Sequence, residues 1–231
     1  METGRRLVCA LPLLIAAALV PSLQATPADL DHSIRQFFKQ EDSSPAYRAV
    51  RRLEAVNGKR SGWLEAVTEY APENGFRYQV TAEGGNSYIR DNVLRAVLDG
   101  EKDLIARGEE KRSSLVDDNY TFAPKGVGDD GLITVLVSPR RKERTLVAGE
   151  MFLASDGRLV KLQGQLAKSP SFWIKNVAIV RTYDRIAGSV VPVALESRAQ
   201  MRMFGQATLN MTYQYSQING RAVADTVRAG S

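Results

Sequence analysis

The fold is decided by a stretch of alternating residues, VVPVALESRAQMRMF at positions 190–204. One of its faces collects the apolar residues Val193, Leu195, Ala199, Met201 and Met203. The opposite face is polar or charged, and this period of two is typical of a β-strand with one wet side. After Gly205 the segment 206–217 repeats the pattern with Leu209, Met211, Tyr213 and Tyr215. The two segments therefore predict an antiparallel pair with one apolar face.

On either side of this pair, most of the chain is predicted to form short strands separated by turn residues. The expected strands are 62–70, 76–81, 132–137, 145–154, 158–167 and 176–183. Asp156-Gly157 is a hairpin signal, and Asn219-Gly220 ends the series. The total is eight or nine strands in an antiparallel meander, which favours a curled sheet or a barrel.

Three segments have the period of a helix instead. In residues 26–38 a capping threonine and Pro27 precede apolar residues that share one face. The segment 44–57 repeats the start signal at Ser44-Pro45, and we expect a second helix there. The third segment follows the break at 84–86, carries apolar residues from Ile89 to Ile105, and is interrupted at Gly100. The predicted fold class is α+β, a strongly curved antiparallel sheet (a half-open β-barrel) covered by helices.

The chain begins with a segment typical of a secretory leader. Arg5 and Arg6 precede the short apolar run 7–20, which is shorter than the roughly 20 residues of a membrane span. We expect a cleaved signal peptide over 1–25, a single domain over 26–220 and a flexible tail over 221–231. Cleavage would lower the net charge from +5 to +4 and remove Cys9, the sole cysteine. The predicted location is the bacterial periplasm, where such a protein relies on its core instead of on disulfides.

The composition excludes much catalytic chemistry. The 231 residues contain one histidine, His32, which excludes a histidine metal cluster. The one cysteine, Cys9, lies in the expected leader, so thiol catalysis is not expected of the mature chain. We expect no metal, no cofactor, no catalytic residue and no enzyme activity. A less favoured alternative is a glycan-processing hydrolase that uses the carboxylates of Glu65 and Glu69, which share one face of a strand.

Basic and aromatic clusters suggest contacts with other molecules. Arg140, Arg141, Lys142 and Arg144 crowd one turn, and Arg48, Arg51 and Arg52 crowd the second expected helix. Such groups could touch anionic lipid headgroups or an acidic partner, or could simply be solvated. Phe172-Trp173 lies in a proline-containing turn that could dip into a membrane or plug the sheet. Nucleic acid is not expected, because the net charge is small and no reader motif is present.

The apolar face is the feature most suggestive of function. Methionine suits surfaces that adapt to variable apolar partners, and a sheet curled through many strands tends to enclose space. We therefore expect a non-enzymatic, monomeric binding or carrier protein for a lipid or an acylated protein; the alternative is an envelope protein-interaction module with a filled core. The expected ligand-binding residues are Phe76, Tyr78, Val80, Val93, Val97, Leu195, Met201, Met203, Leu209, Met211 and Tyr213.

The order of elements resembles one known family. The chain has, in order, a leader, a helix, strands, a helical insertion and a long meander. This order is similar to that of the bacterial periplasmic lipoprotein-carrier superfamily, with its LolA/LolB-like fold. The stretches that carry the likeness are GEMF (149–152), DGRLVKLQG (156–164), VPV (191–193), GGNSYIR (84–90) and SPSFW (169–173). The resemblance covers residues 30–220. It implies a half-open barrel with an apolar cavity for acyl chains beneath a helical lid, locked by an arginine for which Arg77 and Arg90 are candidates.

Overall fold

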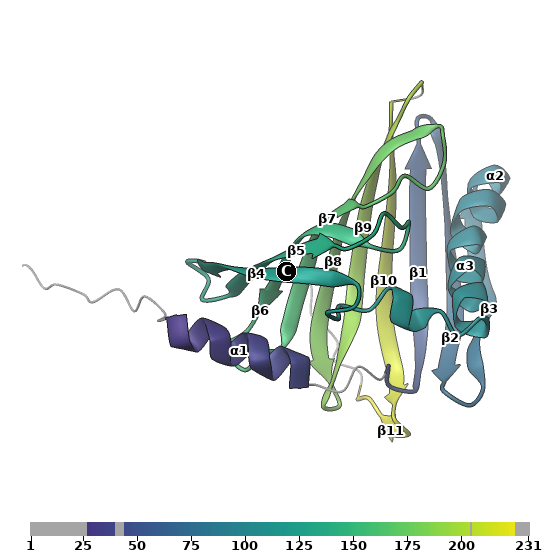
Figure 1. Ribbon diagram of the computed structural model, residues 1–231. Helices are drawn as coiled ribbons and strands as arrows, with labels where there is room; N and C mark the ends of the chain where they lie inside the picture. Colours follow the sequence, from purple (N-terminus) through teal and green to yellow (C-terminus); the bar gives the residue numbers. More distant parts are fainter. Residues whose placement is uncertain (1–26, 40–43, 204, 225–231) are drawn as a thin grey trace, which may run out of the picture.

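The protein is built on one open, curved antiparallel sheet (Figure 1). The computed structural model describes residues 27–39, 44–203 and 205–224. The order of the main strands is β3-β2-β1-β10-β9-β8-β7-β6-β5-β4, and β11 pairs with β10. Their bounds are β1 Tyr47–Asn57, β2 Arg60–Ala71, β3 Gly75–Gly85, β4 Tyr120–Val127, β5 Ile133–Pro139, β6 Val147–Leu153, β7 Leu159–Leu166, β8 Ile174–Ile186, β9 Ser189–Met201, β10 Gln206–Ile218 and β11 Arg221–Ala222.

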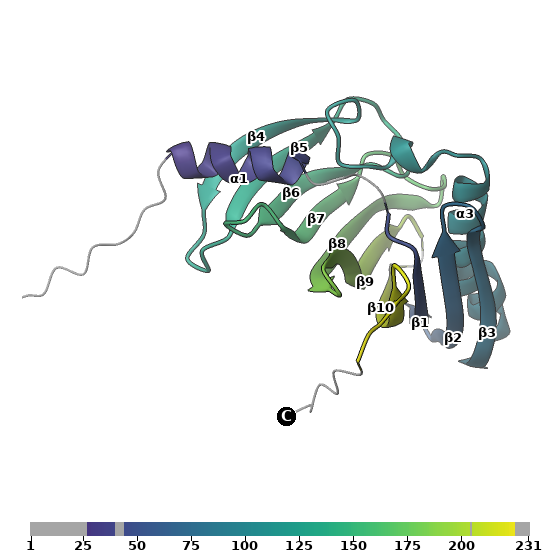
Figure 2. The ribbon, with the colours of Figure 1, turned by 90° about the horizontal axis from the view of Figure 1, so that it is seen from below.

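Two meanders of unequal length meet within this sheet. Strands β4 to β10 follow one another as neighbours, and so do β1 to β3. The pairing of β1 with β10 joins the two sets, with Leu53 opposite Met211. Seen along the strands in Figure 2, the sheet bends into an arch. The antiparallel sheet and its strong curvature were predicted from the sequence, and the structure agrees with an open curved sheet of class α+β.

Helix α1 (Pro27–Lys39) covers the half of the sheet that contains β4 to β7 (Figures 1 and 2). Its residues Ile34 and Phe37 pack against a cluster that includes Val135, Met151 and Leu153. The Ser33 hydroxyl donates a hydrogen bond of 2.8 Å to the carbonyl of Ser155. The helix predicted at 26–38 is confirmed over the part that the structure describes.

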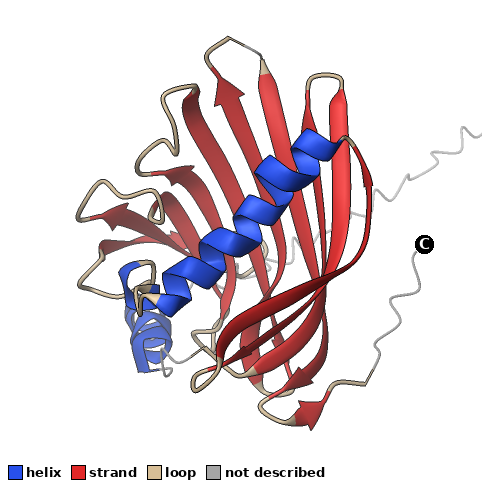
Figure 3. Ribbon diagram, turned by 90° about the vertical axis from the view of Figure 1, so that its right-hand side faces the viewer, coloured by secondary structure: helices blue, strands red, loops and turns tan. Residues whose placement is uncertain are grey.

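A second helical segment covers the other half of the sheet. It runs continuously through α2 (Ser87–Ile89), a π-helical turn η1 (Arg90–Leu94) and α3 (Arg95–Ala106). Figure 3 shows it crossing the strands obliquely. Because Ile179 of β8 packs against both apolar clusters, this segment and α1 lie on the same face of the sheet. A short 3₁₀ turn, η2 (Glu110–Arg112), leads from the helix towards β4.

One predicted helix is a strand. Residues 47–57 form β1, which is paired on both sides with β2 and β10. Its buried side chains are Ala49, Arg51, Leu53 and Ala55, which alternate with exposed or half-buried ones. The helical interpretation placed Val50 on the apolar face, but Val50 is 37% exposed. Two long hydrogen-bonded ladders outweigh the weak helical pattern of this segment.

Strands β6 and β7 approach each other closely at a pair of glycines. Gly149 and Gly164 face each other across the two strands, on the side that carries Met151 and Leu162. A Cβ on Gly149 would lie 2.1 Å from the carbonyl oxygen of Gln163. The two backbones approach so closely that neither position has room for a side chain.

The two outer strands are β3 and β4. The edge strand β4 contains Pro124, followed by a register shift between Pro124 and Gly126. The side chain of Lys125, which lies in this bulge, forms an ion pair of 2.6 Å with Glu150 of β6. Pairing of β4 is therefore irregular along part of its length.

The other sequence expectations hold in part. The expected strands at 62–70 and 76–81 and those between residues 132 and 217 are present, and most of them are longer than expected. Gly100 does not interrupt the helix, because α3 runs through it. The expected leader at 1–25 and residues 225–231 of the expected tail lie outside the described residues. Within the described ranges, no helix is long and apolar enough to cross a membrane.

Two glycine substitutions, which should change the free energy of unfolding in opposite directions, test the close approach of β6 and β7. Gly149→Ala should lower the free energy of unfolding by roughly 1–3 kcal/mol, because the strands must move apart to admit the methyl group. Gly100→Ala is the matched control. A Cβ there meets nothing within 4 Å, so the better helix former should stabilise the protein by roughly 0.5–1 kcal/mol. Urea unfolding measures both changes, and equal effects would contradict the assigned close approach.

Candidate functional site

Most of the predicted ligand-binding residues meet between the sheet and the helical segment α2–η1–α3, called the cover below. They belong to one apolar cluster whose centre is fully buried, with Leu53 and Leu64 from the sheet and Leu94 and Leu98 from the cover. The predicted residues in this cluster are Phe76, Tyr78, Val80, Val93, Val97, Leu195, Leu209, Met211 and Tyr213. The side chains of the sheet and the cover pack directly against one another here.

The two remaining predicted residues lie elsewhere. Met203 is 71% exposed, because β9 ends at Met201 and Met203 belongs to the following turn. Met201 is half-buried at the end of β9 and is absent from the apolar clusters of the described residues. The expectation that Met203 shares the interior with Met211 is therefore wrong. The alternation in the sequence continues past the point where the strand turns.

A buried arginine lies within this apolar cluster. Arg51 of β1 is only 2% exposed. Its guanidinium donates two hydrogen bonds to the carboxylate of Glu101 on α3, of 2.6 and 2.9 Å, and a third to the hydroxyl of Tyr47. The rings of Phe76 and Tyr213 lie 5.0 and 4.7 Å from the guanidinium carbon. A bidentate carboxylate and two aromatic faces thus surround the charge.

The electrostatics explain how this charge persists in the interior. Burial by itself would lower the pKa of Arg51, but hydrogen bonding to Glu101 and the charge of that carboxylate raise it above its ordinary value. Burial also raises the pKa of Tyr47, so this phenol stays neutral and accepts the hydrogen bond from Arg51. Arg51 therefore keeps its positive charge in the interior at neutral pH.

Further polar contacts attach the cover to the edge of the sheet. The Tyr78 hydroxyl of β3 donates a hydrogen bond of 2.7 Å to Asp99, and burial together with this bond raises the pKa of Tyr78 to about 12. Glu83 of β3 pairs with Arg95 at 2.6 Å. Of the two candidate locking arginines, Arg90 lies 3.8 Å from Glu83, whereas Arg77 pairs with Glu69 within the sheet.

A second arginine enters the same interior from the centre of the sheet. Arg181 of β8 is half-buried and lies opposite Leu195 in the register. It interacts with the hydroxyl of Tyr183 and with the charge of Glu101. Its Nε, like that of Arg51, is buried and has no hydrogen-bond partner among the described residues. A second guanidinium therefore faces the interior from the inner side of the sheet.

The carboxylates considered for catalysis lie on the outer face of the sheet. Glu65 pairs with Arg52 at 2.8 Å, and Glu69 pairs with Arg48 and Arg77 at 3.4 and 3.2 Å. Each alternates with the buried residues of β2. These are cross-strand charge pairs on a wet surface. The described residues include no group of three His, Cys, Asp or Glu side chains that could hold a metal ion.

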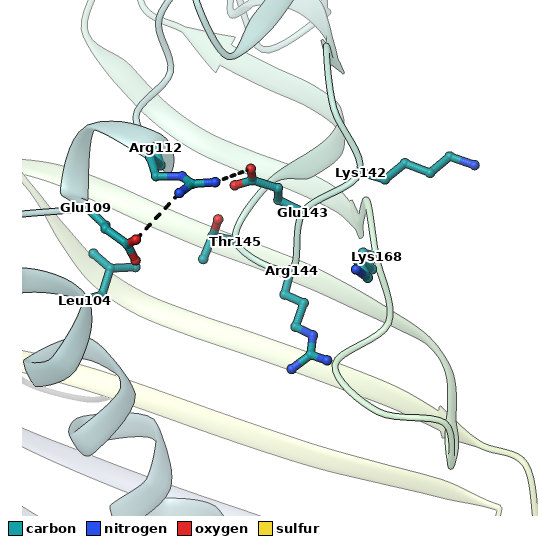
Figure 4. Close-up of a pocket in the computed structure, with 8 residues that line it drawn as sticks. All are labelled: Leu104, Glu109, Arg112, Lys142, Glu143, Arg144, Thr145 and Lys168. Atoms are coloured by element: carbon teal, nitrogen blue, oxygen red, sulfur yellow. Dashed lines mark hydrogen bonds and ion pairs between the residues drawn. The ribbon is translucent and has the colours of Figure 1, made fainter. Parts of the chain in front are cut away.

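The basic turn forms part of a surface pocket of about 330 Å³ (Figure 4). Arg112 pairs there with Glu109 at 3.5 Å and Glu143 at 2.7 Å. In Figure 4 the side chain of Lys142 points away from this ion-paired group. The lining residues are Leu104, Glu109, Arg112, Lys142, Glu143, Arg144, Thr145 and Lys168. None of them belongs to the predicted apolar site.

The functional residue that the sequence interpretation missed is Arg51. It was grouped with Arg48 and Arg52 on a helix surface, and only Arg51 of the three is buried. The period-two pattern Ala49, Arg51, Leu53, Ala55 was the available signal. The charged residue in that series obscures the strand pattern, because arginine is rarely fully buried unless it is paired.

Comparison with known proteins returned likenesses of structure. No protein-family model and no curated protein matches the chain. Among solved structures, it is similar to a LolA superfamily protein from Nitrosomonas europaea, with 10% identity, TM-score 0.41, and 86% of this chain and 96% of that one covered. A DUF1329 family protein from Desulfovibrio piger has 13% identity, TM-score 0.31, and coverages of 81% and 90%. A third match is MucB in complex with MucA(peri), with 10% identity, TM-score 0.20, and coverages of 81% and 93%.

Proposed function

We propose that the protein is a non-enzymatic periplasmic carrier or binding protein for a lipid or an acylated protein. The acyl chain enters between the sheet and the cover, among the nine predicted residues that meet there. The observation that carries the proposal is the construction of the interface: a broad apolar face of the sheet is covered by one separate helical segment. The affinity comes from apolar surface removed from water.

The cover is suited to move as a unit. It is one continuous helical segment that begins at Ser87 and ends at Ala106. Its buried anchors are Ile89, Leu94 and Leu98, while Val93 and Val97 are only half-buried at its border. Displacement of the helix would expose the apolar side chains of β1, β2 and β10 without breaking a strand pairing. An acyl chain that replaces the helix contacts would compensate for their loss.

The Arg51–Glu101 pair supplies the closing contact. Each opening of the cover removes Glu101 from Arg51 and exposes that cation to water or to the ligand. A polar group of an amphipathic ligand can take the place of the carboxylate, and the neighbouring Arg181 adds a second positive charge. The site therefore suits a molecule that combines an acyl chain with an anionic or carbonyl-bearing head.

A second candidate function is a protein-interaction module with a filled core. The observation in its favour is the tight packing beneath the cover, together with the pocket around Arg112 and Arg144. In that case the apolar cluster is purely structural, and the partner contacts the charged loops.

Thermal unfolding of delipidated protein separates the two candidates. A palmitoylated peptide should raise the Tm, and the same peptide without its acyl chain should not. A ligand at about 100 times its Kd adds about 2.7 kcal/mol to the free energy of unfolding. No shift with the acylated peptide, and no lipid in native mass spectra of protein from its own envelope, would favour the interaction module.

The location of binding is tested by two arginine substitutions on α3. Val97→Arg places a charge at the border between the cover and the sheet and should weaken binding of the palmitoylated peptide by about tenfold or more. Ala96→Arg is the control, because Ala96 is exposed on the same helix. Both variants are measured by fluorescence titration with a labelled peptide. Equal affinities would place the acyl chain elsewhere.

The role of Glu101 is tested through stability. Glu101→Ala leaves the buried Arg51 without its counter-charge and should lower the free energy of unfolding by about 3–5 kcal/mol. The double variant with Arg51→Leu should recover part of this loss, because the orphaned charge is then gone. Asp103→Ala, at an exposed site on the same helix, should leave stability nearly unchanged. Urea unfolding measures all three, and an unaltered Glu101→Ala protein would show that the pair does not hold the cover.

A further inference from the structure

The most exposed large apolar side chains gather at one end of the sheet. Among the described residues, the four highest exposures of such side chains belong to Phe172 (74%), Met203 (71%), Trp173 (55%) and Tyr88 (53%). Phe172 and Trp173 lie in the β7–β8 loop, Met203 lies in the β9–β10 turn, and Tyr88 lies in α2. These four residues are called the tip below. Single exposed apolar residues are ordinary, but a group of four calls for a partner.

Interactions between the loops hold the tip in place. The backbone N–H of Arg202 donates to the carbonyl of Trp173 at 2.9 Å, and its side-chain Nε donates to the carbonyl of Phe172 at 2.7 Å. The Arg202 guanidinium also lies 5.0 Å from the centre of the Phe172 ring. The two aromatic rings meet edge to face at 5.5 Å. Arg202 of the β9–β10 turn therefore holds Phe172 and Trp173 of the β7–β8 loop in one preformed arrangement.

The β1–β2 turn and the start of α2 lie at the same end. Asn57, the last residue of β1, is opposite Ala207 at the start of β10. The N–H of Asn86 donates to Ser61 at 2.7 Å, and Arg60 lies over the ring of Tyr88. In Figure 1 the β1–β2 turn, the β9–β10 turn and α2 all lie at the top, and the β9–β10 turn projects farthest.

The loops that carry the tip are basic, and the acids Glu109 and Glu143 line the pocket of Figure 4 beside Lys168. Segments 57–61, 86–88, 167–175 and 201–206 contain no aspartate or glutamate. Their basic residues are all exposed: Lys59, Arg60, Lys168, Lys175 and Arg202. At the opposite end of the strands, the β2–β3 and β6–β7 turns contain the acids Glu73 and Asp156. An anionic surface would therefore attract the basic loops of the tip.

We propose that the tip docks the protein onto a bilayer that contains anionic phospholipid. Aromatic and methionine side chains enter the interfacial region, and the five cations contact lipid headgroups. A bilayer is favoured over a protein partner because the apolar residues project from turns, and a fluid surface accepts such protrusions without a matching pocket. This inference goes beyond the proposed carrier function and does not require an acyl ligand beneath the cover.

The test is flotation with vesicles of phosphatidylcholine, alone or mixed with phosphatidylglycerol. Protein purified from its own envelope should float with the mixed vesicles and far less with phosphatidylcholine alone. Phe172→Ala together with Trp173→Ala should reduce partitioning by about tenfold or more, since both interfacial anchors are lost. Leu136→Ala is the matched control, because Leu136 is 43% exposed on β5. Mass spectrometry fixes the N-terminus, which must be the same in all variants.

Two further measurements separate insertion from simple charge attraction. The chain has two tryptophans, and Trp63→Phe leaves Trp173 as the reporter, whose emission should shift to the blue on mixed vesicles. Replacing Lys59, Lys168 and Lys175 by glutamate should abolish binding to those vesicles. The proposal is overturned if the wild type does not float, or if the double alanine variant floats equally well. Retention of a protein partner by the tip without vesicle binding would also overturn it.

Discussion

The contact between Arg51 and Glu101 is the constraint on which the arrangement of sheet and cover depends. A guanidinium taken out of water carries a large desolvation cost, and it is tolerated only where hydrogen bonds and an opposite charge surround it. The sheet supplies the aromatic faces of Phe76 and Tyr213, but the carboxylate comes from α3. The sheet alone therefore cannot satisfy the cation at its centre. The cover is needed for more than its apolar contacts, and the bidentate geometry also sets where along β1 the helix lies.

Regular alternation and strong turn residues made much of the fold predictable. The hairpin signals at Asp156-Gly157 and Asn219-Gly220 lie where the chain turns. Within β9 and β10, the side chains predicted to share an apolar face do lie on one face, with Leu195 opposite Met211. The failure at β1 has a physical origin. Its inward face contains two alanines, one leucine and an arginine, so its apolar pattern is weak, and its identity as a strand comes from pairing with β2 and β10. Strand β2 follows β1 directly, but β10 lies much farther along the chain. A local sequence pattern carries no information about pairing with such a distant strand.

The candidate site was predictable to the extent that it is apolar. Strand and helix periodicity brought nine of eleven residues to one cluster, because side chains on the inner face of a curved sheet converge with those of the helix packed on it. Met203 was misplaced because strand ends are set by turn geometry, which the alternation does not record. The polar interior of Arg51, Glu101 and Arg181 was not foreseen. Arg51 and Glu101 lie far apart in the sequence, on a strand and a helix, and only the folded structure shows that they meet.

The irregular edge at β4 has a consequence for an open sheet of this kind. A sheet that does not close leaves unpaired N–H and C=O groups along its outer strands, and these groups can template the addition of another chain. On β4 the proline ring of Pro124 removes one donor, and the bulge at Lys125 disturbs the spacing of the rest. A neighbouring copy would find no regular ladder to extend along this part of the edge. This part of the β4 edge is therefore a poor template for edge-to-edge polymerisation of the open sheet.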